Sequence, residues 1–494
     1  MVGGTRGRRG YAAAMAAGLL VSVGMVQASA ADLGGSCCSD LEERIAELEA
    51  TTARKGNRKV SLEIYGQVNE ALMYWDDGKE SNVYQVTNDN SRTRIGFRGK
   101  AKIDADWEAG YRIEIGVRSA NSKRSNQFNA KGDGNPADIG LDLRDSYWFV
   151  KNKKFGSVSL GMQASATDQI TEINQTQTKD FAKYSDVEDT GFGLLLRSAI
   201  NGRLTNNAVT PTTSATSSPG DNGLTLRRLI GDGGDQPGEG ERRFNLIKYE
   251  SPEIAGFTAS ASWGEDDFWD LALRYTGEFG GFKVAAGVGY GKVTDGYYLQ
   301  TKTVCAGRAD AAPGVASTDQ KCDQFGGSIS VVHEATGLFL NAGAGVKNDD
   351  YLKKQARFAT VAGVDDSQDF WAVQAGIEKK FNEFGKTTIY GEYYDYEGGA
   401  NSRRTVTQSD ALSPDPAAAH GWAIWGTGVE VFGAGIAQGF DKAAMVLYLS
   451  YRHVESDLTL KGLTGATSGP ASGAIRNAPV EDVDLVMTGA IIKF

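Results

Sequence analysis

The chain has 494 residues with a formal net charge of -10, and it contains 63 Gly but only 3 His and 4 Cys. Its mean hydropathy of -0.34 is too low for a bundle of membrane-spanning helices. So few His and Cys argue against a metal centre built from these residues. The acidic balance argues against a protein that coats DNA or RNA.

Residues 1–30 have the pattern of a secretory signal peptide. Three Arg lie in the first nine residues, an apolar stretch covers 11–26, and Ala-Ser-Ala at 28–30 has the small residues of a cleavage site. These small residues favour cleavage over an uncleaved membrane anchor. No later stretch reaches about 18 uninterrupted apolar residues. The chain is therefore predicted to be exported, and then to be either soluble or a β-barrel.

The segment that follows, 31–58, contains one short amphipathic pattern. Residues 37–54 read CCSDLEERIAELEATTAR, in which Leu41, Ile45 and Leu48 repeat at a spacing of four and then three. This spacing predicts a helix of about two heptads. Two interpretations stay open: a coiled-coil stub that joins copies of the chain, and a lone surface helix.

From residue 60 to the end, apolar and polar residues alternate. In 107–120, for example, Trp107 and Ile113 share a face that is opposite to Arg112 and Glu114. A period of two predicts strands with one apolar and one polar side. Sixteen segments have this pattern: 60–75, 91–103, 107–120, 141–150, 157–166, 243–251, 256–263, 268–279, 281–293, 324–334, 337–347, 369–381, 386–397, 422–438, 442–454 and 482–494.

The gaps between these segments alternate in length. Gaps after odd-numbered segments are mostly long: 76–90, 121–140, 167–242, 294–323, 348–368, 398–421 and 455–481, with 264–267 the exception. Gaps after even-numbered segments are mostly tight turns. An outer-membrane barrel sorts its connections in this way, because its periplasmic turns are short and its outer loops are long. The pattern predicts an all-β fold, a 16-stranded antiparallel transmembrane β-barrel over 59–494.

Aromatic residues near strand ends fit the two girdles of such a barrel: Trp107, Tyr147, Phe149, Tyr275, Tyr290 and Trp371. The last strand alternates up to a terminal Phe494. That ending resembles the one that outer-membrane barrels present to the barrel-assembly machinery.

Four longer stretches stand out: "LRDSYWFV" with "FGSVSLGMQAS", "NLIKYESPEIAGFTASASW", "IAQGFDKAAMVLYLSYRHV" and "MTGAIIKF". In this order they resemble the trimeric general porins of Gram-negative bacteria, of the alphaproteobacterial kind. The resemblance covers about residues 60–494. Two departures are Met162-Gln163, where many porins carry Arg after Gly, and the absence of Pro-Glu-Phe-Gly from 167–242.

The resemblance implies a general diffusion porin. Such a protein is a homotrimer in outer-membrane lipid, and it passes ions and small hydrophilic solutes passively, without a cofactor, a metal, a nucleic-acid partner or enzyme activity. The segment 31–58 would then be periplasmic.

The resemblance also implies that loop 167–242 folds partly into the pore. Acidic residues of its first half, Asp180, Asp186, Glu188 and Asp189, would then face a basic wall made of Arg92, Arg94, Arg98, Arg112, Arg118 and Arg144. Opposite charges across the narrowest point would set a transverse field that disfavours apolar solutes. The alternative is that these Arg are ordinary lumen residues paired with neighbours such as Glu114. Residues 201–240 are rich in Gly, Thr and Ser, and their place inside or outside the pore stays open.

The four cysteines form two groups. Cys305 and Cys322 fall in the same predicted outer loop, 294–323, which favours a disulfide between them. Cys37 and Cys38 follow the predicted cleavage site in an oxidising compartment, and bonds between chains stay open for them.

Other functions fit the sequence less well. An outer-membrane hydrolase needs a nucleophile beside a base, but His333, His420 and His453 are scattered and no nucleophile motif accompanies them. A substrate-specific channel often carries a continuous charge ladder or an aromatic slide. Here there is a basic cluster without such a slide, so general diffusion is favoured. A structural tether acting through the 37–54 helix is the third alternative.

Overall fold

The computed structural model describes residues 59–132, 139–205, 224–231, 236–240, 243–264, 268–296, 320–350, 352, 363–406, 411–413, 422–462 and 474–494. The predicted signal peptide, the 31–58 segment, Cys37, Cys38, Cys305 and His420 lie outside these residues. No helix in the described part of the chain is long and apolar enough to cross a membrane.

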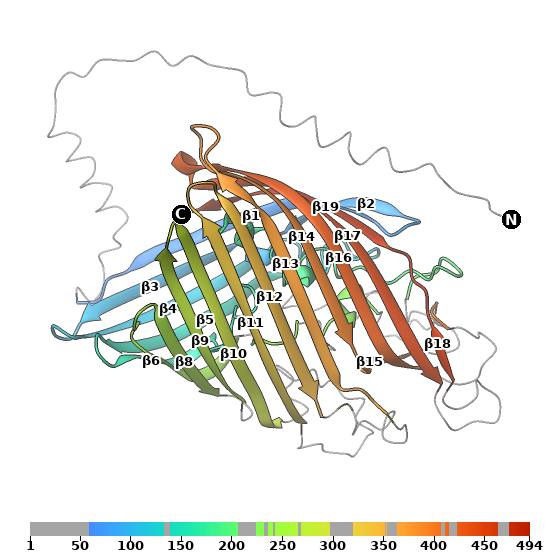
Figure 1. Ribbon diagram of the computed structural model, residues 1–494, viewed down its shortest axis with the longest axis horizontal. Coiled ribbons are helices and arrows are strands. Elements are labelled where there is room, and N and C mark those ends of the chain that lie inside the picture. Colours follow the sequence, from blue (N-terminus) through green and yellow to red (C-terminus); the bar gives the residue numbers. More distant parts are fainter. Residues whose placement is uncertain are drawn as a thin grey trace, which may run out of the picture. The chain divides into compact units, whose positions relative to one another are not determined.

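The described strands form one antiparallel sheet that closes on itself, because β1 pairs with β19 (Figure 1). The strands are β1 (Glu63–Asp76), β2 (Ser81–Thr87), β3 (Arg94–Lys102), β4 (Trp107–Arg118), β5 (Gly140–Asn152), β6 (Gly156–Ala164), β7 (Arg243–Glu250), β8 (Phe257–Gly264), β9 (Phe268–Phe279), β10 (Phe282–Gly296), β11 (Gln320–His333), β12 (Leu338–Asp349), β13 (Ser367–Lys379), β14 (Thr387–Gly398), β15 (Asn401–Val406), β16 (Trp422–Phe440), β17 (Met445–Gly462), β18 (Ile475–Asn477) and β19 (Val483–Lys493). The short 3-10 helices are η1 (Asp89–Ser91), η2 (Gln177–Asp180), η3 (Val187–Asp189), η4 (Leu226–Leu229) and η7 (Asp441–Ala443).

Three of the short strands share a place in the barrel wall with a longer neighbour. β2 and β3 both pair with β1, β14 and β15 both pair with β16, and β18 and β19 both pair with β17. The wall therefore has sixteen strand positions, and the predicted 16-stranded antiparallel barrel is confirmed. Each of the sixteen predicted segments corresponds to one of these positions.

The first outer connection is shorter than the sequence pattern predicted. The gap 76–90 is not a long loop, because β2 begins at Ser81 and leaves only a turn of four residues after β1. Asp77 closes this turn, since its Oδ1 accepts hydrogen bonds from the backbone N–H of Lys79 (3.3 Å) and Glu80 (2.9 Å). Gly78 supplies the positive φ of +83° that the turn needs.

Along most of the wall, the two faces of the sheet differ as predicted. On β11, the outward residues Phe325 and Ile329 are exposed, whereas the inward residues Gln324, Ser328 and Ser330 are buried. Apolar side chains that point away from a closed barrel suit contact with lipid tails.

The connection between β6 and β7 runs back inside the barrel, where inward side chains of the wall hold its backbone. The Asp270 carboxylate on β9 accepts hydrogen bonds from the backbone N–H of Ala166 (3.1 Å) and Thr167 (2.7 Å). On the other side of the barrel, Arg452 on β17 donates to the carbonyl oxygens of Lys183 (2.7 Å) and Val187 (3.3 Å). We call the described residues 165–196, 224–231 and 236–240 the inner loop.

Glycines on three adjacent strands let the inner loop approach the wall. Gly287 on β10, Gly326 on β11 and Gly343 on β12 are among those that point inward. A Cβ at Gly343 would lie 2.3 Å from the carbonyl oxygen of Thr171, and a Cβ at Gly326 would lie 2.6 Å from Thr171 Cγ2. We call this surface the glycine floor. Any larger residue there would push the loop away.

Further round the barrel from the glycine floor, the interior is apolar and filled. Leu194, Leu226 and Ile230 of the inner loop are fully buried in one cluster with wall residues such as Trp422 and Leu485. The wall around β16–β19 thus carries apolar residues on both faces, unlike the predicted alternation. This cluster places residues 224–231 inside the barrel, and the described residues 236–240 pack against the wall at Gly345 and Gly326.

We expect Gly343→Val to displace the inner loop, because a Val side chain would overlap the Thr171 carbonyl. Overpacking of this kind costs about 1–3 kcal/mol. The barrel should still fold, with a lower midpoint for thermal loss of tertiary structure and an altered single-channel conductance. Ala344→Val, next to it but on the outward face of β12, is the control. If the two variants had the same thermal midpoint and the same conductance, the inner loop would not pack on Gly343 as described.

Candidate pore constriction

A cavity of about 1020 Å³ lies between the inner loop and the wall at β3–β5, β7 and β9. The charged side chains among its described lining are the basic Arg92, Arg94, Arg118, Lys123, Arg124, Arg144, Lys179, Lys183, Arg227, Arg243 and Arg274 and the acidic Asp89, Asp142, Asp168, Glu172, Asp180, Asp186, Asp189 and Glu239. Eleven are basic and eight are acidic, a difference of +3. The cavity is thus locally basic in a chain whose net charge is -10.

Four of the six arginines predicted for the basic wall line this cavity, namely Arg92, Arg94, Arg118 and Arg144. All four make an ion pair or hydrogen bond with neighbouring wall residues. Arg92 Nη2 lies 2.8 Å from Asp142, Arg118 Nε lies 2.7 Å from Asp89, and Arg144 Nε lies 2.8 Å from Glu114. These four arginines are paired with neighbours and also face the cavity, and their role as the pore constriction stays a prediction.

The other two predicted arginines are not part of the cavity lining. Arg98 is more than half exposed and pairs with Glu63. Arg112, which is opposite to Arg98 in the sheet, donates to Tyr65 (2.7 Å) and Glu114 (2.6 Å). A strand advances about 3.3 Å per residue, so Arg98 lies roughly 13 Å along β3 from Arg94. Residues an even number of positions apart on a strand share a face of the sheet, but they can lie at different heights in the barrel.

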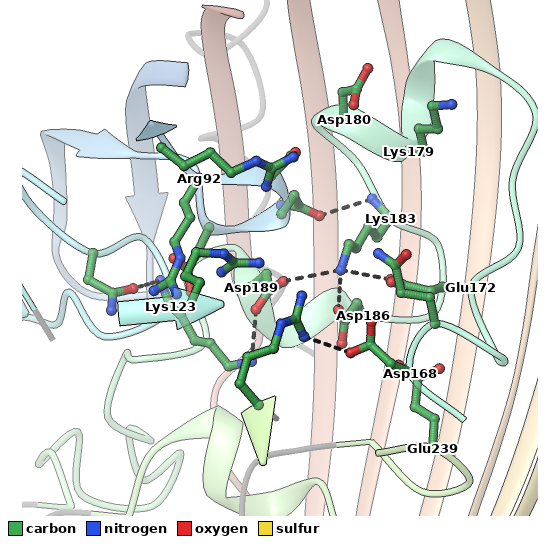
Figure 2. Close-up of a pocket in the computed structure, with 18 of the residues that line it drawn as sticks. Arg92, Lys123, Asp168, Glu172, Lys179, Asp180, Lys183, Asp186, Asp189 and Glu239 are labelled. Atoms are coloured by element: carbon green, nitrogen blue, oxygen red, sulfur yellow. Dashed lines mark hydrogen bonds and ion pairs between the residues drawn. The ribbon is translucent and has the colours of Figure 1, made fainter. Parts of the chain in front are cut away.

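Three of the four predicted loop acids, Asp180, Asp186 and Asp189, line the cavity. Figure 2 shows Arg92 on one side of it and Asp168, Glu172 and Glu239 on the other. Glu188 is not in the lining. It is fully buried behind Asp189, with Lys123 Nζ at 3.7 Å.

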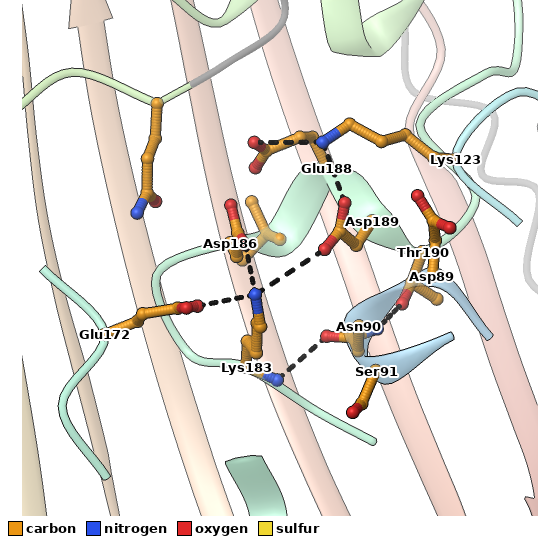
Figure 3. A network of polar contacts seen from close by, with 12 residues as sticks. Asp89, Asn90, Ser91, Lys123, Glu172, Lys183, Asp186, Glu188, Asp189 and Thr190 are labelled. Carbon is orange, nitrogen blue, oxygen red and sulfur yellow. Dashed lines mark hydrogen bonds and ion pairs between the residues drawn. The ribbon is translucent and has the colours of Figure 1, made fainter. Parts of the chain in front are cut away.

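Two lysines that the sequence analysis did not single out neutralise much of the acidic loop. Lys183 Nζ lies 2.7 Å from Glu172, 2.6 Å from Asp186 and 3.9 Å from Asp189 (Figure 3). Lys123 Nζ lies 2.8 Å from Asp189. The loop side of the cavity is therefore much less negative than its carboxylates alone would make it.

The protonation of these buried groups is strongly perturbed. Burial raises the pKa of Asp189 to about 6 and that of Glu239 to about 7, and the nearby charge of Asp186 adds to both shifts. Burial also raises the pKa of Glu172 and Glu188 well above the ordinary value. For Lys183 burial acts in the opposite direction, but the carboxylates of Asp186, Glu172 and Asp189 hold its pKa well above normal.

Two further arginines in the cavity come from strands beyond the predicted basic wall. Arg243, at the start of β7, pairs with Asp168 (2.8 Å). Arg274 on β9 donates to the carbonyl oxygens of Ala166 and Asp168, both at 2.8 Å. Inward parity on β7 and β9 could have identified both, but the sequence does not show which strands face the loop.

Two further observations concern the cysteines and metal binding. Cys322 is disulfide-bonded, but its partner lies outside the described residues, so pairing with Cys305 stays a prediction. Among the described residues, no group of three or more His, Cys, Asp and Glu is arranged to hold a metal ion.

The sequence profile of the family described as Gram-negative porin matches residues 12–457. Since this is most of the chain, the protein belongs to that family. No curated protein matches it closely enough to count as a relative.

Similar solved structures have low sequence identity. OmpT of Vibrio cholerae is 13% identical over 89% of this chain and 99% of its own, with a TM-score of 0.47. An anion-selective porin from Comamonas acidovorans is 14% identical over 88% and 100%, also at 0.47. The outer membrane channel DcaP of Acinetobacter baumannii is 11% identical over 90% and 100%, at 0.45.

Family and fold together define the class of protein. It is a multi-pass β-barrel of the outer membrane and a general diffusion porin. The alphaproteobacterial type and the signal peptide stay predictions.

Lys183→Met should destabilise the inner loop, because it leaves three buried carboxylates without their shared cation. Breaking a buried ion pair typically costs about 3–5 kcal/mol. We expect cleavage of the loop by added protease at pH 8 to be faster by at least about a hundredfold. The effect should shrink at pH 5, where Asp189 is protonated.

Lys179→Met is the matched control, since Lys179 lines the same cavity but is exposed. Equal cleavage rates for the two variants would show that Lys183 does not hold the loop.

Proposed function

We propose that solutes cross this porin through the cavity between the inner loop and the four arginines Arg92, Arg94, Arg118 and Arg144, which we call the arginine wall. Passage needs no catalysis and follows the solute's own gradient. The observation that carries this proposal is the position of the loop. It fills the apolar side of the barrel at β16–β19 and leaves a charged cavity of about 1020 Å³ against β3–β5. The remaining passage is therefore narrow and polar.

Charge governs passage in this proposal. Solutes that carry dipoles can orient in the field of fixed charges, whereas apolar solutes would have to displace ordered water. Because Lys183 and Lys123 neutralise the loop acids, the arginine wall dominates the field. Anions should therefore pass more readily than cations, although the chain as a whole is acidic.

The proposed assembly is a homotrimer surrounded by lipid. The outward apolar band supplies the surface for lipid tails. Phe494 is exposed and its backbone pairs with Gly66, with N–H···O distances of 2.9 and 3.0 Å. The C-terminal residue is thus both the closing point of the barrel and the proposed signal for the assembly machinery. Deleting residues 37–54 and measuring both conductance and envelope integrity separates the pore function from the tether alternative.

The test of the proposal is the reversal potential of single channels in a planar bilayer under a KCl gradient. The unmodified protein should prefer chloride. Arg94→Ala combined with Arg144→Ala should lower the chloride-to-potassium permeability ratio roughly fourfold or more. In water, a unit charge at about 5–10 Å is worth about 0.4–0.8 kcal/mol, and two such charges are lost.

Arg98→Ala serves as the control, because Arg98 lies outside the cavity lining and is exposed. A double variant with the selectivity of the unmodified channel would remove the arginine wall from the pore, and a preference for potassium in the unmodified channel would contradict its dominance.

Chloride preference should increase as pH falls from 8 to 5. Glu239 and Asp189, with pKa values of about 7 and about 6, lose their negative charge in this window. Lys and Arg stay charged throughout, so the cavity becomes more positive. Glu239→Gln should remove the part of the change near pH 7. A reversal potential that is flat with pH, or moves toward potassium, would rule out these two carboxylates as lining charges.

A further inference from the structure

We propose that Arg92, Arg94 and Arg144 form a binding subsite for the oxyanion group of a passing solute, a carboxylate or a phosphate. This inference rests on the proposed function, because the subsite lies in the proposed passage. The inference extends the proposed function. A positive field favours all anions, whereas a binding subsite retains only anions whose geometry matches its donors. Figure 2 shows Arg92 among the residues that line the cavity.

The three residues lie at one end of β3–β5, since Arg94 begins β3, Arg92 precedes it and Arg144 lies near the start of β5. In the sheet, Gly116 on β4 is opposite Arg94 on one side and Asp142 on the other. A Cβ at Gly116 would lie 3.0 Å from Arg92 Cζ and Nε and 2.6 Å from Asp142 Oδ1. The missing side chain therefore leaves the space in which the guanidinium of Arg92 lies beside Asp142.

Around Arg92, Arg94 and Arg144 there are fewer carboxylates than arginines, so single carboxylates are shared. Arg94 Nε and Arg144 Nε both approach Glu114 Oε1, at 3.9 and 2.8 Å, while Arg112 uses Oε2 of the same carboxylate at 2.6 Å. Asp142 is shared as well, with Arg92 at 2.8 Å and Arg118 at 3.8 Å. Arg118 also pairs with Asp89 (2.7 Å) and Arg112 with Asp145 (3.0 Å). Five arginines thus face four carboxylates, and one added anion would complete the charge balance.

The guanidinium groups of Arg92, Arg94 and Arg144 also have N–H donors that are not used in these contacts. Within the described part of the chain, Arg92 donates through Nη2 to Asp142, and its Nε is buried without a partner. Arg144 donates through Nε to Glu114, and Arg94 donates through Nη2 to Gln67 (3.3 Å) and Ser91 (3.5 Å). Since each guanidinium carries five N–H donors, most of them remain for a ligand.

The geometry of the guanidinium N–H donors favours ligands that have two or more acceptor oxygens. A guanidinium is planar and weakly hydrated, and its paired N–H groups match two oxygens of a carboxylate or phosphate. Arg92 is 7% exposed and the Arg94 and Arg144 side chains are 25% and 17% exposed, so water competes less here than at the surface. Chloride has no second acceptor atom and gains less from this arrangement.

The experiment measures single-channel current as a function of potassium phosphate concentration, each value divided by the KCl current of the same channel. A subsite predicts that the phosphate current saturates, with half-saturation between about 1 and 100 mM. Arg94→Lys combined with Arg144→Lys keeps both charges but removes the paired donors. This variant should raise the half-saturating concentration at least tenfold, which a field that depends on charge alone would not do.

Arg98→Lys is the matched control and should saturate as the unmodified protein does. A linear phosphate current in the unmodified channel would overturn the subsite while the channel itself stands, and so would saturation unchanged by the double lysine variant. Absence of KCl current from folded protein would contradict the proposed function, and the subsite with it. Once phosphate saturation is established, repeating the titration with acetate tells whether the subsite also retains a carboxylate.

Discussion

A loop inside a barrel must find partners for its backbone polar groups, because an unpaired buried N–H or C=O costs as much as a lost hydrogen bond. In this porin, wall side chains supply them. Asp270 anchors the start of the inner loop, Gln374 donates to the carbonyl of Ala182 (3.1 Å), and Arg452 holds the following turn. The glycine floor then permits close approach without a cavity. Together these contacts fix where the loop lies, and hence where the passage is left open.

The electrostatics of the passage follow from that position. The loop brings Glu172, Asp186 and Asp189 to the cavity, but it also brings Lys183 into their midst. Lys183 thus neutralises much of the negative charge of the loop. The arginine wall that faces the loop keeps a net positive charge. An acidic chain can therefore have a basic constriction, since net charge counts every residue and permeation depends on the few that line the narrowest path.

The sequence predicts the barrel well because each strand has a local signature, the alternation of apolar and polar residues. It misplaced the first outer loop because residues 81–87 pair with β1 after a four-residue turn that the pattern did not separate from a gap. The inner contacts are harder to predict, since Lys183, Arg243 and Arg274 act through partners far away in the chain. The sequence does contain one usable signal, the inward glycines of β10–β12 such as Gly287 and Gly343. They lie where the inner loop packs against the wall.

The central claim is that the inner loop stays on the wall while the channel conducts. Thr178 Oγ1 on the loop lies 2.7 Å from Gln374 Oε1 on β13, so we would replace both residues by Cys in a background with Cys37→Ser and Cys38→Ser. The account predicts that the pair cross-links under oxidation, and that single-channel conductance is the same before and after reduction. A conductance that changes severalfold on reduction in this variant, but not in the Cys37→Ser, Cys38→Ser background with the same Cys322 disulfide, would contradict the claim. So would a pair that does not cross-link in folded protein.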